Sequence, residues 1–252
     1  MRNRMFPVLV SISALIMVVM ACGSSPTTTT TQFDATTSAS QGISSSSSSA
    51  APKATPTTAA KISLEVGSYT HFTDSIGSLW FVGEVVNNGD AAAGSVDVAL
   101  SLLDDAGSVA AVGSDTISYI APNGKYPFHI LITSAPPSWT KEKIQIQGTA
   151  IGPASFLVPY VALKTDNITG HMSSFGTFQL TGSVSNTGQK TATLVHIAAS
   201  AYDKDGNVVD VADTYAELNE IAPGADSPFS IDFLNLNKAP ASYAVFVDSY
   251  SK

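Results

Sequence analysis

One sequence pattern occurs twice in this chain, and the duplication limits the folds that the chain can adopt. The segment from Gly83 to Gly107 and the segment from Gly182 to Gly206 align at an offset of 99 residues. Solenoid repeats are shorter than this and need at least about three copies. The 252 residues also leave room for two domains and a leader. We therefore expect a duplicated domain, with one copy over residues 61–152 and the other over residues 153–252.

Each copy contains a stretch of alternating apolar and polar residues, which is the pattern of an antiparallel strand with one buried face. The residues expected to face the two cores are Val96, Val98, Leu100 and Leu102, and Val195, Ile197, Ala199 and Ala201. Other short apolar runs predict strands at 61–69, 78–87, 108–112, 116–120, 126–133 and 144–150, and at 207–211, 229–233 and 243–250. No window of 11 residues shows a convincing helical stripe. The prediction is an all-β chain with two tandem immunoglobulin-like antiparallel β-sandwiches.

Turn residues mark the ends of these stretches. The strand before Gly89 ends in two asparagines, and we expect a turn there because Asn and Gly tolerate positive φ. The runs D-D-A-G and D-K-D-G begin at Asp104 and Asp203 and predict hairpin turns in which these two residues cap backbone amides. The second run differs from a calcium-binding EF-hand loop, which has Gly at position six and Glu at position twelve.

The first 21 residues have the pattern of a secretory signal peptide, with two arginines followed by about 15 apolar residues. The tetrad from Val19 to Cys22, V-M-A-C, resembles the bacterial lipobox. The resemblance implies cleavage between Ala21 and Cys22 and a diacylglycerol group on the Cys22 thiol. Because two or three acyl chains hold a protein firmly in a bilayer, a multiply acylated Cys22 would be a stable anchor.

Residues 22–60 follow the leader as a tract rich in Ser, Thr, Pro and Ala. After Cys22 its only charged residues are Asp34 and Lys53, and its only aromatic residue is Phe33. A segment of this composition buries too little apolar area to offset the entropy of ordering it. We expect a disordered spacer between the membrane and the folded part. The density of Ser and Thr also leaves open O-glycosylation.

The charge of the chain excludes one large class of partner. The formal net charge is −8, and Arg2 and Arg4 in the leader are the only arginines. Nucleic-acid binders need clustered Lys and Arg to displace counterions from phosphates. We therefore expect no nucleic-acid partner. The single cysteine also leaves no possibility of a disulfide within the chain or of a cysteine metal cluster.

The repeated motifs resemble the FxLYD family of small immunoglobulin-like domains from bacterial and archaeal surface proteins. The residues that carry the resemblance are G-x-V-x-N-x-G, the alternating strand ending in L-L-D or A-Y-D, and A-P-x-G before an apolar strand. The second copy is more similar, because it keeps Tyr202 before Asp203 where the first copy has Leu103. The resemblance implies a sandwich fold and supplies no catalytic residues.

No catalytic site is predicted. The sequence has no G-x-S-x-G, no H-E-x-x-H and no phosphate-binding loop. The four histidines, His71, His129, His171 and His196, form no pair at metal-binding spacing, so we expect structural roles, no metal site and no cofactor. Trp80 and Trp139 are candidate interaction residues, because an exposed aromatic on a sandwich can bind a glycan or a protein. The alternative for these tryptophans is packing in a core or between domains.

These expectations combine into one hypothesis. The chain is a non-catalytic lipoprotein that contacts the membrane through Cys22 and displays two sandwiches to a protein or envelope partner. It would be anchored in the cell membrane and face the extracellular side, or the periplasm where the host has an outer membrane. The alternative is a surface module that binds a small ligand such as a carbohydrate or a metal.

Overall fold

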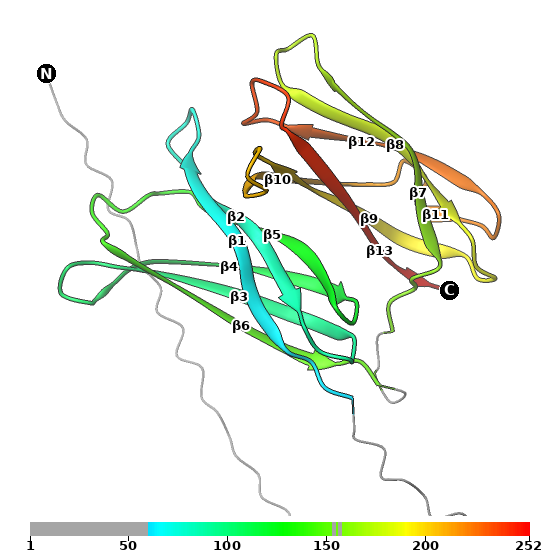
Figure 1. Ribbon diagram of the computed structural model, residues 1–252, viewed down its shortest axis with the longest axis horizontal. Coiled ribbons are helices and arrows are strands. Elements are labelled where there is room, and N and C mark those ends of the chain that lie inside the picture. Colours follow the sequence, from blue (N-terminus) through cyan, green and yellow to red (C-terminus); the bar gives the residue numbers. More distant parts are fainter. Residues whose placement is uncertain (1–59, 153–154, 156–157) are drawn as a thin grey trace, which may run out of the picture. The chain divides into compact units, whose positions relative to one another are not determined.

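The alternating stretches of both halves form long antiparallel strands in the computed structural model, which describes residues 60–152, 155 and 158–252. Each half pairs its strands in the same order (Figure 1). The described residues contain no helix, so the prediction of an all-β chain is confirmed. They accordingly hold no helix long and apolar enough to span a membrane. The predicted leader, Cys22 and nearly all of the predicted spacer lie outside the described residues.

The first half contains six strands in two sheets. These strands are β1 (Leu64–Thr73), β2 (Leu79–Asn87), β3 (Ala93–Leu103), β4 (Val109–Ile120), β5 (Gly124–Ile132) and β6 (Lys141–Ala150). Sheet A has the order β1-β2-β5, and sheet B has the order β4-β3-β6. The two predicted strands at 108–112 and 116–120 are wrong in one respect, because β4 continues through both. The residues between them stay in register with β3, where Ser114 pairs with Ala99.

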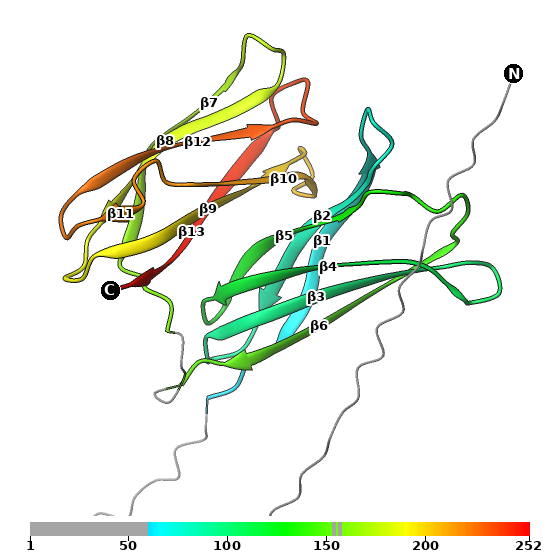
Figure 2. The same cartoon turned by 180° about the vertical axis from the view of Figure 1, so that it is seen from behind.

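The second half repeats this arrangement with one additional short strand. Its strands are β7 (Leu163–Met172), β8 (Phe178–Asn186), β9 (Ala192–Tyr202), β10 (Val208–Tyr215), β11 (Glu220–Ile221), β12 (Asp226–Phe233) and β13 (Ser242–Ser251). Sheet C has the order β12-β8-β7. In sheet D the strand β9 pairs with β10, β11 and β13 (Figure 2). Every pairing in both halves is antiparallel.

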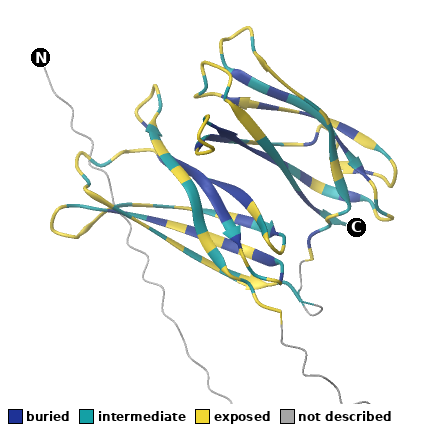
Figure 3. Cartoon of the chain, in the orientation of Figure 1, coloured by how far each residue is buried: buried dark blue, intermediate teal, exposed yellow. Residues whose placement is uncertain are grey.

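Each pair of sheets encloses its own apolar core. The first core contains Phe81 of sheet A and Leu100 of sheet B, and the second contains Phe229 of sheet C and Ile197 of sheet D. All eight residues predicted to face the cores from β3 and β9 are buried. Figure 3 shows exposed residues in the turns and hairpin tips and also along outer strands such as β1, whereas β2 is largely buried. The described residues of both halves belong to a single compact unit, and the predicted boundary at residue 152 stays a prediction.

The motif asparagines act differently from the prediction. Asn87 and Asn186 are fully or almost fully buried, and neither has a positive φ. The side chain of Asn87 accepts a hydrogen bond from the amide of Gly89 and donates to the carbonyl oxygens of Ala91 and Ala121. Asn186 repeats this pattern in the second half. The asparagine therefore closes the strand by satisfying buried backbone groups through its side chain.

The two aspartate turns form as predicted. Asp104 accepts a hydrogen bond from the amide of Ser108, and Asp203 accepts bonds from the amides of Asp205 and Asn207. The glycine of each turn has φ 82°, a left-handed conformation that costs glycine little. These turns connect β3 to β4 and β9 to β10.

Candidate functional site

The two halves meet along one face of sheet A and one face of sheet D, in a contact that we call the seam. The apolar part of the seam joins Val82 and Phe72 of the first half to Tyr202, Val208 and Val211 of the second. The alternation of β2 explains why Val82 is available, since Phe81 and Leu79 point into the core on the other face of the strand. The outer face of sheet A is therefore apolar at its centre and is covered by β10.

A buried carboxylate lies beside this apolar patch. Glu84 of β2 is 4% exposed and accepts hydrogen bonds from the hydroxyls of Ser200 at 2.9 Å and Tyr202 at 2.5 Å, both from β9. The Lys125 ammonium lies 2.9 Å from the other oxygen of Glu84 and 3.0 Å from the Tyr202 hydroxyl. Burial would lower the pKa of Lys125, but its bonds to Glu84 and Tyr202 raise it. The Glu84 charge is therefore paired and hydrogen-bonded within the seam.

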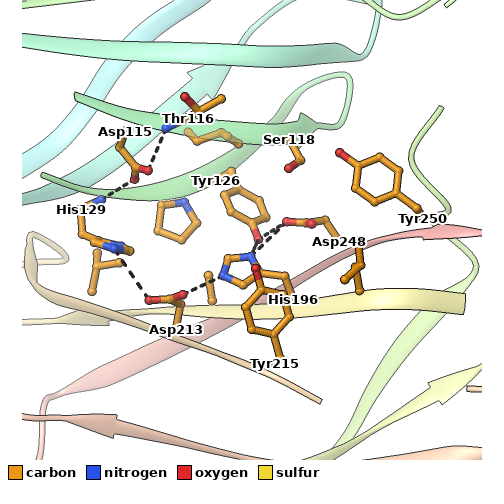
Figure 4. A pocket seen from close by; sticks show the side chains of 15 residues that line it. Asp115, Thr116, Ser118, Tyr126, His129, His196, Asp213, Tyr215, Asp248 and Tyr250 are labelled. Carbon is orange, nitrogen blue, oxygen red and sulfur yellow. Dashed lines mark hydrogen bonds and ion pairs between the residues drawn. The ribbon is translucent and has the colours of Figure 1, made fainter. Parts of the chain in front are cut away.

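A cavity of about 270 Å³ lies in another part of the seam, and we call it the seam cavity. Fifteen residues line it, from β4 and β5 of the first half and from β9, β10 and β13 of the second (Figure 4). Its ionisable and aromatic lining side chains are Asp115, Tyr126, His129, His196, Asp213, Tyr215, Asp248 and Tyr250. The fifteen lining residues include no Lys and no Arg.

His196 is the central charged group of the seam cavity. Its Nε2 atom lies 2.8 Å from Asp213 Oδ2, and its Nδ1 atom lies 3.4 Å from Asp248 Oδ2. Burial alone would lower the pKa of His196, but the hydrogen bonds and charges of the two aspartates outweigh it and raise the pKa to about 9. At neutral pH His196 is therefore an imidazolium between two carboxylates.

Tyr126 connects the first half to this group. Its hydroxyl donates a short hydrogen bond to Asp248 Oδ2 and lies 3.2 Å from His196 Nδ1. Burial, together with the nearby negative charge of Asp248, raises the pKa of Tyr126. The tyrosine therefore keeps its proton and acts as a donor across the seam.

His129 and Asp115 form the opposite wall of the seam cavity. The backbone amide of His129 donates to Asp115 Oδ2 at 2.9 Å, and the amide of Thr116 donates to Oδ1 at 2.8 Å. The His129 ring points toward Asp213, with 3.8 Å between Nε2 and Oδ1 (Figure 4). Hydrogen bonding to His196 lowers the pKa of Asp213. All three aspartates of the cavity are thus fixed by neighbouring groups.

The histidines that meet at Asp213 were not recognised as a pair in the sequence. His129 and His196 come from different halves and from non-equivalent strands, so no local spacing connects them. The alignment of the two copies gives one indication of this site, because His196 stands where the first half has the exposed Asp97. His71 stacks on Phe81 at 5.0 Å between ring centroids, and His171 is exposed on β7. Within the described part of the chain, no group of three or more His, Cys, Asp or Glu residues is arranged to hold a metal ion.

The structure does not place the two candidate tryptophans in the seam cavity. Trp80 lies on the outer face of β2, where its indole N–H donates to Asp74 at 2.9 Å. Its ring centroid is 6.2 Å from that of His129. Trp139 is half-buried and packs on the first core, 5.8 Å from the ring of Phe81. Both tryptophans are partly buried.

Comparisons with known proteins give no family. No family model and no curated protein matches this chain. Among solved structures it is similar to red sea bream transglutaminase, with 10% identity, a TM-score of 0.25, and coverage of 77% of this chain and 29% of that chain. It is also similar to the exo-chitosanase CsxA of Amycolatopsis orientalis, with 14% identity, a TM-score of 0.19, and coverage of 73% and 24%. This chain spans less than a third of either protein, and similarities this weak carry no argument about function.

Proposed function

We propose that this chain is a lipid-anchored extracytoplasmic protein that displays two β-sandwiches for contact with a protein or envelope partner and catalyses no reaction. The observation that carries the proposal is the position of its single cysteine. Cys22 follows an apolar leader directly and completes a tetrad that resembles the lipobox. The low-complexity tract to residue 60 then supplies a spacer between the lipid and the folded part.

The fold supports a contact role, because sheet B leaves the outer face of β3 and β4 exposed. Partly buried Trp80 remains a candidate contact residue. The relation to the FxLYD family is part of the same proposal and rests on the repeated motifs.

Metabolic labelling tests the anchor. Cells that express the full chain are grown with labelled palmitate, and the chain is followed through membrane fractionation. We expect label on the chain and recovery with membranes, both lost in Cys22→Ser because the acceptor thiol is gone. Ser24→Ala, two residues away, keeps the thiol and should behave like the wild type. A wild-type chain that carries no label would disprove the anchor.

A second candidate function is the binding of a small ligand, and the seam cavity favours it. Binding sites are concave, lie preferentially between domains, and combine a few fixed polar groups with apolar and aromatic walls. The seam cavity has these properties, since Ile117, Pro127 and Val211 line it beside the aspartates and tyrosines. In this role the chain would present a small ligand at the cell surface.

A further inference from the structure

We propose that the seam cavity binds a small organic cation, an alkylammonium group, between the two halves. The inference rests on the second candidate function, ligand binding at the seam, and it names the chemical class of the ligand. It is independent of the lipid anchor. Three properties of the cavity lead to it: the sign of its charge, its free acceptor atoms and its aromatic walls.

The charge of the lining is negative in every protonation state of the histidines while the aspartates are ionised. Three carboxylates, Asp115, Asp213 and Asp248, face two histidines, and no Lys or Arg is present among the lining residues. Even with both rings protonated, one negative charge remains. A partly buried cavity strengthens the attraction for a cation, because its surroundings screen charge less than bulk water does.

Two carboxylate oxygens in the cavity are available to accept a hydrogen bond. Asp248 is 4% exposed, and its bonds to Tyr126 and His196 both end on Oδ2. Its Oδ1 atom accepts no hydrogen bond from the residues that the structure describes. Asp213 Oδ1 lies 3.8 Å from His129 Nε2, beyond hydrogen-bonding distance. An ammonium group has three N–H donors and no acceptor, which matches oxygens of this kind.

Aromatic rings complete the site. Tyr126 forms part of the inner wall, and Tyr215 and Tyr250 also line the cavity (Figure 4). Tyr215 is 61% exposed, and its ring centroid lies 5.1 Å from that of His196, so it forms the outer part of the lining. The faces of aromatic rings attract ammonium groups. Three aspartates and three tyrosines, with one negative charge left even when both histidines are protonated, therefore favour an organic cation over an anion.

The volume limits the size of this ligand. About 270 Å³ lies just below the range of roughly 300–1,000 Å³ typical of ligand pockets. The cavity therefore suits a small amine. A metal ion is disfavoured, since the described residues offer no set of three ligands in suitable positions.

Calorimetric titration of the full chain tests the proposal. The probe is 1,4-diaminobutane at pH 7, and the matched control is 1,4-butanediol, which has the same length and carries no charge. We expect one diamine per chain, bound at least tenfold more tightly than the diol, with an affinity that falls as salt is added. No binding of the diamine, or equal binding of both compounds, would overturn the proposal. Equal binding of both compounds would still be consistent with a small-ligand site but not with a preference for cations. Neither result bears on the labelling of Cys22.

Three variants locate the binding. Asp213→Asn should weaken the diamine at least tenfold, and Tyr215→Ala, at an exposed ring that the fold does not need, should weaken it at least threefold. Asp205→Asn removes the same charge from an exposed turn outside the cavity and should change the affinity less than twofold. If Asp205→Asn weakens binding as much as Asp213→Asn does, the diamine is attracted to the acidic chain as a whole and the site is wrong.

Discussion

The same two valines occur in both halves of the chain, and their surroundings are opposite. Val109 and Val112 of β4 are 61% and 66% exposed, whereas Val208 and Val211 at the equivalent places of β10 are 2% and 8% exposed. The turn before each strand is also equivalent, so local sequence does not explain the difference. The valines of β10 are buried because that strand covers sheet A of the other half.

The central strands show the same contrast. The outer face of β3 carries exposed Asp97 and Ala99, but the outer face of β9 is buried at Ala198, Ser200 and Tyr202. Small residues at Ala198 and Ser200 let the opposing sheet approach closely. The alternating pattern thus determines which residues form each core, while a few substitutions on the outer face determine which sheet packs against the other half.

The largest expected effect comes from placing a charge at the equivalent valines. Val211→Asp should lower the free energy of unfolding by roughly 4–5 kcal/mol, because the new carboxylate is buried without a partner. Val112→Asp makes the same change on the exposed strand and should stay within about 0.5 kcal/mol of the wild type. Urea denaturation of both variants measures the difference. Equal losses would mean that the seam does not bury β10 in solution.

The next largest effect is the contribution of Asp210 to the stability of the fold, which depends on pH. The first half has Ala111 at this place, whereas Asp210 is 2% exposed and its Oδ2 atom has no hydrogen-bond partner among the described residues. Burial raises the pKa of Asp210 to about 7, against 3.8 in the unfolded chain. The folded state therefore holds its proton more tightly. The resulting stability is fully present below about pH 4 and is lost as the pH rises to about 7.

The variant Asp210→Asn should remove this dependence. The free energy of unfolding of the variant, relative to that of the wild type, should rise between pH 4 and pH 7. The rise should be roughly 4 kcal/mol, which corresponds to the full difference between the folded and unfolded pKa of Asp210. Denaturation curves at several pH values measure the gain. Asp205→Asn, on an exposed turn, should show no such trend. A wild-type to Asp210→Asn difference that does not vary with pH would contradict the buried, protonated Asp210.

A smaller effect is expected at the equivalent serines of the central strands. Ser200→Leu should cost about 2–3 kcal/mol, since the larger side chain does not fit against β2 and Glu84 loses a donor at 2.9 Å. Ser101→Leu, on the outer face of β3, should be nearly neutral. Thermal unfolding of the pair checks this. Similar melting temperatures for the two variants would show that the outer face of β9 is not packed.

Much of the fold could be predicted from the sequence, because strands and turns depend on local patterns. The core residues of β3 and β9 and the two aspartate turns are where alternation and turn chemistry placed them. The role of the motif asparagines was missed, since Asn87 acts through backbone groups that lie up to 34 residues away. The continuation of β4 was missed because the polar Ser114 and Asp115 interrupt its apolar run.

The candidate site could not be predicted in the same way. Its residues are brought together by contact between two halves, and no period in the sequence records which faces meet. His129 and His196 appeared as isolated histidines for this reason. The departures from the repeat do hold the information, since Val82, Glu84 and Tyr202 stand opposite Thr181, Ser183 and Leu103 in the alignment. These substitutions identify a contact surface only when it is known which sheets pack against each other.

The seam joins sheet A of one half to sheet D of the other, so the two surfaces in contact are different. A contact between unlike faces leaves the complementary face of each half unused, so further copies could add head to tail in a ring or an open series. Val109 and Val112 still offer the surface that such an extension would use. The second half has Thr181 and Ser183 where the first has Val82 and Glu84, and so lacks the matching acceptor. These substitutions on β8 therefore disfavour the docking of a further copy on the second half.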